Sequence, residues 1–121
     1  MSPKTESVLS IRYSEEDNIF IVFLKGNLDI FNLQKIKDSV EKNISGKEKV
    51  IFDMSELEYI DSAGIGFIVG TLKKLKLENS DYSLAICGLN EYLAGIFKLI
   101  SFSKLIPILD NLNEAKKILN D

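Results

Sequence analysis

The first part of the chain alternates apolar and polar residues in the pattern typical of β-strands. Residues 8–13 show this alternation, and residues 18–25 form a longer run of aromatic and β-branched side chains. The stretch between them, Glu15-Glu16-Asp17-Asn18, has the composition of a turn. These segments therefore predict an antiparallel β-hairpin.

In the middle of the chain the spacing of apolar residues changes to the period of an α-helix. After residues 26–29, a first helix is predicted by apolar positions separated by charged ones: Leu33, Ile36, Val40 and Ile44. Residues 45–47 end it, and residues 50–52 predict a short buried strand. A second helix is predicted from Ser62 to about Leu77. Its core-facing stripe consists of Ile65, Ile68, Val69, Leu72 and Leu75.

The second half of the chain continues the alternation of strands and helices. We expect a strand at 82–86, a helix at 89–100, a short edge strand at 105–109 and a last helix at 112–119. The helix at 89–100 is expected to turn four apolar side chains inward: Leu93, Ile96, Phe97 and Ile100. This order predicts an α/β fold with a mixed sheet of four or five strands and helices mainly on one face, because crossovers between parallel strands are right-handed. One domain fills residues 1–121, with an ordered core at about 6–120.

The absence of histidine excludes more functions than any other feature of the composition. Ser-His-Asp and Cys-His catalysis, HExxH metal sites and facial-triad iron sites all require imidazole. Cys87 is the one cysteine, so neither an intrachain disulfide nor a cysteine-based zinc cluster can form. Its place at the end of a buried strand predicts a small core residue.

The charge balance argues against polyanionic partners. The chain has 18 Asp and Glu against 15 Lys and Arg, a net charge of −3 and a pI of about 5.0, so its attraction for nucleic acid is weak. No apolar run approaches the ~18 residues that span a bilayer, and residues 1–6 lack the apolar core of a signal peptide. We therefore expect a cytoplasmic protein that binds neither nucleic acid nor a membrane.

Residues 59–66, Tyr-Ile-Asp-Ser-Ala-Gly-Ile-Gly, are the one place where small and polar residues interrupt the regular pattern. The glycines at 64, 66 and 70 miss the dinucleotide fingerprint by one residue, and no Gly-Lys-Ser/Thr follows a glycine loop. The nucleophile elbow Gly-x-Ser-x-Gly fails because position 60 is Ile. We therefore expect neither a nucleotide site nor a hydrolase site, and no enzymatic activity.

Acidic residues follow the predicted strand at 50–52. Asp53 comes at its end, and Glu56 and Glu58 lie in the predicted acidic loop behind it. Carboxylates of this kind can bind a cation, but solvated surface charge is the favoured interpretation. We expect no metal and no other cofactor.

The segment at 59–66 also carries the signals of a helix start. Either Asp61 or Ser62 is expected to accept a hydrogen bond from an N–H group of the first turn. Gly64, Gly66 and Gly70 each cost the helix up to about 1 kcal/mol relative to Ala. Three glycines in one helix indicate that something other than helix stability requires small residues there.

A helical projection gives the second helix a bare flank beside its apolar stripe. Ser62, Gly66, Gly70 and Lys73 lie on this flank, and Phe67 points further outward. An exposed Phe67 next to small residues would let another backbone approach closely. Alternatively, Phe67 packs under a neighbouring helix.

Three segments together resemble one protein family. They are Gly26-Asn27-Leu28-Asp29 before the first helix, Val50-Ile51-Phe52-Asp53, and residues 59–66 at the start of the second helix. In their order and spacing over nearly the whole chain they resemble the bacterial anti-sigma factor antagonists, the single-domain members of the STAS family. The Asp-Ser-x-Gly-[Leu/Ile]-Gly motif at 61–66 is the most specific part. The resemblance implies a single STAS-like domain.

The resemblance also implies a modification site. Ser62 would be phosphorylated by the cognate anti-sigma factor, a serine kinase, and dephosphorylated by a metal-dependent serine phosphatase. Asp61 and Asp29 match the family's acids beside that serine. Asn27 stands where many members carry Glu, which removes a charge from the expected docking loop.

The function implied by the resemblance is that of a switched binding module. The unphosphorylated protein, a monomer or a weak dimer, would capture an anti-sigma factor and so release a sigma factor, and phosphorylation would prevent this by charge repulsion. The expected partner-binding residues are Asp29, Asp61, Ala63, Gly64, Gly66 and Phe67. The alternative is a STAS scaffold, or a regulatory subunit, in a signalling assembly or a membrane transporter.

Overall fold

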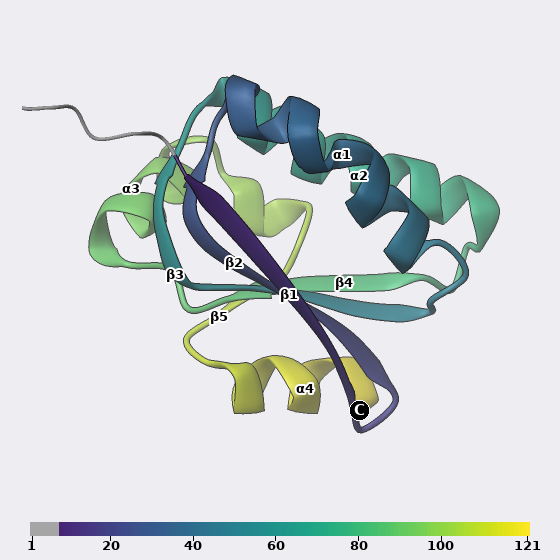
Figure 1. Ribbon diagram of the computed structural model, residues 1–121. Helices are drawn as coiled ribbons and strands as arrows, with labels where there is room; N and C mark the ends of the chain where they lie inside the picture. Colours follow the sequence, from purple (N-terminus) through teal and green to yellow (C-terminus); the bar gives the residue numbers. More distant parts are fainter. Residues whose placement is uncertain (1–7) are drawn as a thin grey trace, which may run out of the picture.

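A five-stranded mixed sheet organises residues 8–121, which are the residues that the computed structural model describes (Figure 1). The strands lie side by side in chain order: β1 (Leu9–Glu16), β2 (Ile19–Leu28), β3 (Lys49–Ile60), β4 (Ser83–Cys87) and β5 (Ile108–Leu109). β1 is antiparallel to β2, and the other neighbours are parallel. The predicted mixed sheet is confirmed, although the edge strand β5 is shorter than the expected 105–109. Residues 6 and 7 of the expected core lie outside the described residues.

A two-residue turn joins β1 to β2. Its residues, Asp17 and Asn18, have φ angles of 53° and 70°. Positive φ at both positions is the type I′ arrangement, whose twist matches that of paired strands, and Asp and Asn tolerate it better than most residues. The hairpin predicted from the acidic turn is confirmed.

Four α-helices cover the two faces of the sheet. They are α1 (Ile30–Ile44), α2 (Ser62–Glu78), α3 (Glu91–Leu99) and α4 (Leu112–Asn120). In Figure 1, α1, α2 and α3 lie on one face and α4 lies alone on the other. The expectation of helices mainly on one face is therefore confirmed.

Strand β3 is much longer than the predicted strand at 50–52, and the expected acidic loop is part of it. Two register shifts in its pairing with β2 each place an extra residue on β3, and such bulges break the two-residue alternation that marks a strand in a sequence. Asp53 is buried and accepts a hydrogen bond from the Ser55 N–H at 2.9 Å, while Glu56 forms an ion pair with Lys25 at 4.0 Å. The carboxylate of Asp53 is thus buried, whereas that of Glu56 lies on the surface.

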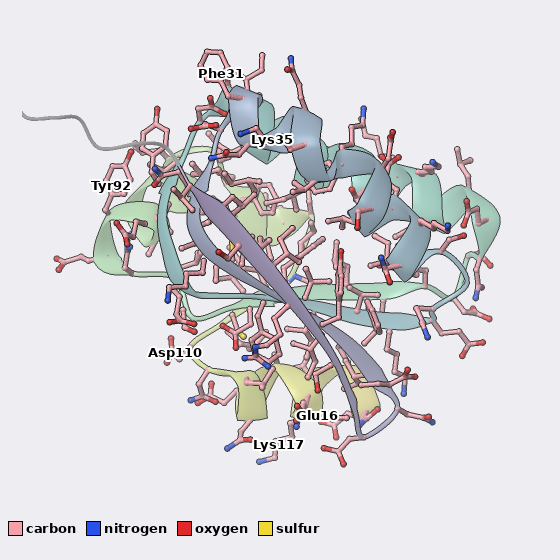
Figure 2. All side chains as sticks on the ribbon, viewed as in Figure 1. Glu16, Phe31, Lys35, Tyr92, Asp110 and Lys117 are labelled. Carbon is pink, nitrogen blue, oxygen red and sulfur yellow. The ribbon has the colours of Figure 1, made fainter. Side chains whose placement is uncertain are left out.

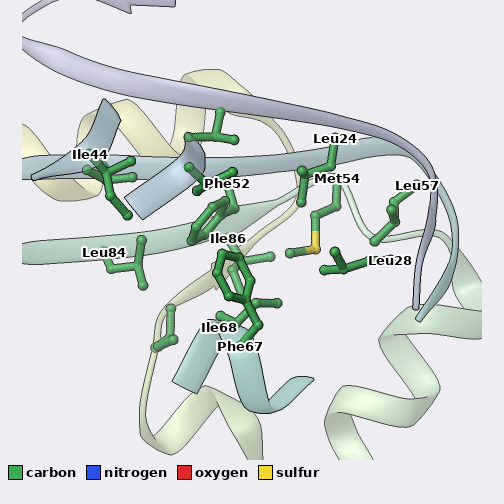
Figure 3. Packing of buried hydrophobic residues seen from close by; sticks show 14 of the residues in the cluster. Leu24, Leu28, Ile44, Phe52, Met54, Leu57, Phe67, Ile68, Leu84 and Ile86 are labelled. Atoms are coloured by element: carbon green, nitrogen blue, oxygen red, sulfur yellow. The ribbon is translucent and has the colours of Figure 1, made fainter. Parts of the chain in front are cut away.

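The larger hydrophobic core fills the space between the sheet and helices α1 to α3, and Figure 3 shows its packing around Phe52 and Met54. A smaller core under α4 includes Ala115 and Cys87. Burial and the neighbouring Asp53 carboxylate raise the pKa of the Cys87 thiol to about 12. Cys87 is therefore a buried neutral thiol, and its prediction as a small core residue is confirmed.

The prediction that Ile100 faces inward is wrong, because its side chain is 49% exposed. Helix α3 ends just before this residue, and Ser101 adopts a left-handed backbone with φ 54°. The chain then turns into a 3-10 helix, Phe102–Lys104. Phe102 enters the core instead, with its ring centroid 4.7 Å from that of Phe97.

Helix α4 is attached to the turn of the hairpin by charged and polar side chains. Lys116 Nζ lies 2.6 Å from Glu16 Oε1 and 3.3 Å from Asp17 Oδ2, and Asn120 Nδ2 donates to the carbonyl of Asp17 at 3.1 Å. Figure 2 shows Glu16 beside α4. Hydrogen bonds from Lys116 and from the Ser14 hydroxyl lower the pKa of Glu16, and the bond to Glu16 raises the pKa of Lys116.

Glu16→Gln is expected to lower the melting temperature near neutral pH and to have little effect in acid. The folded-state pKa of Glu16 lies below its unfolded value of about 4.3. Its stabilisation is therefore present above that value and is lost as the pH falls through the folded-state pKa. Melting curves from neutral pH down to about pH 2 measure the effect, with Glu58→Gln, an exposed carboxylate of β3, as the control. Parallel pH profiles for wild type and Glu16→Gln would contradict the prediction.

Candidate functional site

The N-termini of α1 and α2 lie side by side at the carboxyl end of two parallel strands. Leu28 ends β2 and is paired in register with Ile60, which ends β3. Asp29 and Asp61 follow directly, and each is the N-cap residue of the next helix. Parallel pairing thus brings the two acidic segments, distant in the sequence, to one place.

Asp61 connects the starts of both helices. Its Oδ1 accepts a hydrogen bond from the Gly64 N–H at 3.0 Å, and its Oδ2 accepts one from the Ile30 N–H at 3.2 Å. The first bond is the N-cap of α2. The sequence left the choice between Asp61 and Ser62 open, and the structure identifies Asp61 as the cap. The second bond ties the first residue of α1 to the same carboxylate.

The start of α1 is held by a buried asparagine that sequence analysis missed. Asp29 Oδ1 accepts from the Asn32 N–H at 2.9 Å, and Asn32 Nδ2 donates to the carbonyl of Asn27 at 3.0 Å. Asn32 is a buried polar residue. The sequence feature that could have revealed Asn32 is a polar residue three positions after the Asp N-cap. Asn27 thus contributes its backbone to this turn, whatever the charge of its side chain.

Ser62 is the first residue of α2 and is exposed. The structure assigns its hydroxyl no hydrogen bond to any other residue in the range 8–121. The N–H groups of a first helical turn and the helix dipole attract a negative group placed there. The hydroxyl is therefore accessible from solvent and lies in a favourable field for an added anion.

Gly64, which the sequence places among the expected partner-binding residues, is buried beneath the exposed part of the site. A Cβ atom at this position would lie 2.5 Å from the carbonyl oxygen of Leu28 and 2.7 Å from Cγ1 of Ile60. Gly64 lets α2 begin in direct contact with the ends of β2 and β3. Its contribution is to packing beneath the site.

The expectation that Phe67 points outward is wrong, because Phe67 belongs to the larger hydrophobic core. Its side chain is 7% exposed, and Figure 3 shows Phe67 beside Ile68 in the core. Thr71, on the same side of the helix, is buried as well. Helix α1 lies alongside α2, as the ion pair between Lys74 and Glu41 shows, and the side of α2 that carries Phe67 and Thr71 is buried.

The bare flank of α2 is where the sequence predicts it. Ser62, Gly66, Gly70 and Lys73 are all exposed. An added Cβ at Gly66 or Gly70 would meet no other atom within 4 Å. Ala63 is half-buried at the edge of this flank. The flank starts at Ser62 and leaves room for the backbone of another molecule.

Exposed apolar side chains gather around the same end of the sheet. Phe31, in the first turn of α1, is 72% exposed, and Tyr59 near the end of β3 is also exposed. Helix α3 begins here too, because its N-cap residue Asn90 donates from Nδ2 to the carbonyl of Leu57 at 3.2 Å. Figure 2 shows Phe31 and Tyr92 projecting from this end. We call the exposed apolar residues at this end the apolar rim: Ile30, Phe31, Tyr59 and Tyr92.

The acidic groups of this site are engaged within the fold. The carboxylates of Asp29 and Asp61 are engaged by backbone N–H groups. Within residues 8–121 no cluster of His, Cys, Asp and Glu is placed to hold a metal ion. None of the helices in that range is long and apolar enough to cross a membrane. What the site offers is an exposed hydroxyl, two acidic caps and the apolar rim.

Known proteins resemble the chain in both sequence and structure. The anti-sigma-B factor antagonist of Listeria monocytogenes is 32% identical over 103 residues, which cover 83% of this chain and 88% of the relative. A solved structure from Thermotoga maritima, described as a candidate anti-sigma factor antagonist, has a TM-score of 0.83 at 26% identity and covers 92% of this chain and 95% of its own. An anti-sigma factor antagonist from Mycobacterium paratuberculosis has a TM-score of 0.88 at 15% identity, covering 98% and 100%, which supports the fold.

The family assignment follows from the sequence profile of the STAS domain. This profile matches residues 10–115, from the second residue of β1 into α4. The match includes both acidic caps, Ser62 and all of the sheet except Leu9. The chain belongs to the STAS domain family.

Proposed function

We propose that this protein is an anti-sigma factor antagonist whose binding is switched by phosphorylation of Ser62. The unphosphorylated form captures an anti-sigma factor that is also a serine kinase, and the captured factor releases its sigma factor. A metal-dependent serine phosphatase restores the binding form. The protein acts in the cytoplasm as a binding partner and not as an enzyme.

The observation that carries this proposal is the position of the Ser62 hydroxyl. It is exposed at the first residue of α2, directly after the Asp61 cap and beside the bare flank. A kinase can reach it without unfolding any part of the domain. Relatives that carry the name anti-sigma-B factor antagonist support the class of partner.

The charge of the site explains how phosphorylation acts. A phosphate adds a charge of about −2 next to Asp61 and Asp29. Within the free domain the N-terminus of α2 offsets part of the added charge. Under a bound partner the same phosphate must lose its hydration and faces any carboxylate of that partner. The modification therefore costs binding free energy and leaves the fold intact.

The apolar rim supplies the binding energy in this proposal. Apolar and aromatic side chains in the centre of an interface carry most of its affinity. Asp29, Asp61, Ala63 and Gly66 contribute their surfaces to the contact. Gly64 and Phe67 act beneath it by holding α2 in place.

The modification experiment asks whether Ser62 is the kinase substrate. Incubation with ATP and the cognate anti-sigma factor is expected to add one phosphate, at Ser62, and Ser62→Ala is expected to abolish it. Mass spectrometry of proteolytic fragments locates the phosphate. Four of the other serines serve as internal controls: Ser55, Ser80, Ser83 and Ser101. A phosphate on one of these, with Ser62 unmodified, would overturn the proposal at its central residue.

The switch experiment compares binding with stability. Ser62→Asp is expected to weaken binding to the anti-sigma factor at least tenfold. A charge of −1 at about 6 Å from one carboxylate is repelled by roughly 3 kcal/mol at an effective dielectric of 20. Even after screening, ~1 to 2 kcal/mol remains, and 1.4 kcal/mol corresponds to a factor of ten. Titration calorimetry measures the affinity, and melting curves are expected to change little because an acidic residue suits a first helical turn. Equal affinities, or a collapsed melting temperature, would require another mechanism.

The rim experiment removes one exposed aromatic ring. Phe31→Ala is expected to weaken binding to the anti-sigma factor about tenfold, as truncation of a central aromatic residue does. Stability changes little because the ring is 72% exposed. Leu99→Ala is the matched control, since Leu99 is 86% exposed at the other end of α3. Equal affinities of Phe31→Ala and wild type would remove the rim from the interface.

A further inference from the structure

A cleft lies between the C-terminal end of α3 and the edge strand β5, which the chain joins by a short turn (Figure 1). It has a volume of about 400 Å³, which falls within the range of about 300 to 1,000 Å³ for small-molecule sites. The apolar part of its lining includes Leu89, Ala94 and Ile108. The polar part consists of Lys98, Ser101, Ser103 and Lys104. We call it the α3 cleft.

Backbone hydrogen bonds hold the polar wall of the α3 cleft in place. Ser101 has a left-handed backbone with φ 54°, and its N–H donates to the carbonyl of Lys98 at 3.0 Å. The Lys104 N–H donates in turn to the carbonyl of Ser101 at 3.1 Å. Beneath this turn the rings of Phe97 and Phe102 pack together in the core. The wall is therefore formed before any ligand arrives, and binding requires little ordering of the backbone.

The charge of the lining has one sign. Lys98 and Lys104 are both exposed, and among the described residues that line the cleft there is no Asp or Glu. Within residues 8–121 neither lysine has a carboxylate within ion-pair distance. At the end of α3 the carbonyl of Lys98 accepts from the Ser101 N–H, which weakens the negative potential of that helix end. In a chain with a net charge of −3, this lining thus favours an anion.

The polar groups of the cleft can be reached by a ligand. Ser101 and Ser103 are exposed, as the two lysines are. Hydroxyl and ammonium groups both donate hydrogen bonds, and a carboxylate accepts several at its two oxygens. The apolar part is accessible as well, because Ala94 is exposed and Leu89 and Ile108 are half-buried. The cleft therefore combines donors for an anionic group with an apolar surface beside them.

We propose that the α3 cleft is a second binding site and that it takes a small organic carboxylate with a short alkyl chain. The carboxylate accepts from the ammonium groups of Lys98 and Lys104 and from the hydroxyl of Ser101. The alkyl chain lies on the apolar part of the lining, whose surface it removes from water. The site is at the opposite end of α3 from Tyr92 of the apolar rim, and it is independent of the switch proposed above.

Four probes test the proposal: hexanoate, acetate, hexan-1-ol and hexylammonium. Near neutral pH and at constant ionic strength, hexanoate is expected to shift the backbone amide resonances of Lys98, Ser101 and Lys104 with a Kd of about 1 mM. Acetate lacks the chain and hexan-1-ol lacks the charge, so each is expected to bind at least tenfold more weakly, and hexylammonium not at all. The amides of residues 61–66 are expected to stay in place, which separates this site from the phosphorylation site.

Two variants test the lysines that hold the carboxylate. Lys98→Gln and Lys104→Gln are each expected to weaken hexanoate binding about threefold, and the double variant about tenfold, because each exposed ion pair contributes little. Both side chains are exposed, so the variants keep the fold. Lys117→Gln, at an exposed lysine of α4, is the matched control and is expected to leave the affinity unchanged. The proposal is overturned if the amides of the cleft respond to no probe, if any other probe binds as tightly as hexanoate, or if the double variant keeps the affinity of the wild type.

Discussion

The parallel pairing of β2 with β3 is the constraint on which the site depends. The two strands end in register at Leu28 and Ile60, so the chain leaves the sheet twice at the same level. Both exits lead directly into a helix capped by Asp. A shift of register by one residue would separate the two caps and turn the strand side chains to the opposite face. The position of Ser62 is thus set by strand pairing, although Ser62 itself is in a helix.

The sequence predicts the elements whose signals are local. The hairpin turn at Asp17 and Asn18, the order of strands and helices, and the start of α2 at Ser62 all depend on neighbouring residues. Strand β3 was underestimated because bulges interrupt its alternation. Ile100 was misplaced because a left-handed residue, Ser101, redirects the chain after α3.

The parts of the site that the sequence could not predict depend on contacts between distant elements. A helical projection gives the positions of residues around α2, but it does not show that the side with Phe67 and Thr71 is buried. The choice between Asp61 and Ser62 as the cap required the geometry of the first turn. The apolar rim combines residues from α1, β3 and α3, which only the folded sheet brings together.

The shared carboxylate of Asp61 has a consequence for the thermodynamics of recognition. Because one side chain accepts from the N–H groups of Gly64 and Ile30, the starts of α1 and α2 are fixed relative to each other before any partner arrives. Association then requires little further loss of backbone conformational entropy at this surface. A preorganised surface also needs no slow rearrangement, so encounter rates are set by diffusion and orientation. Under the proposed function, capture of a partner at this surface is rigid docking rather than coupled folding.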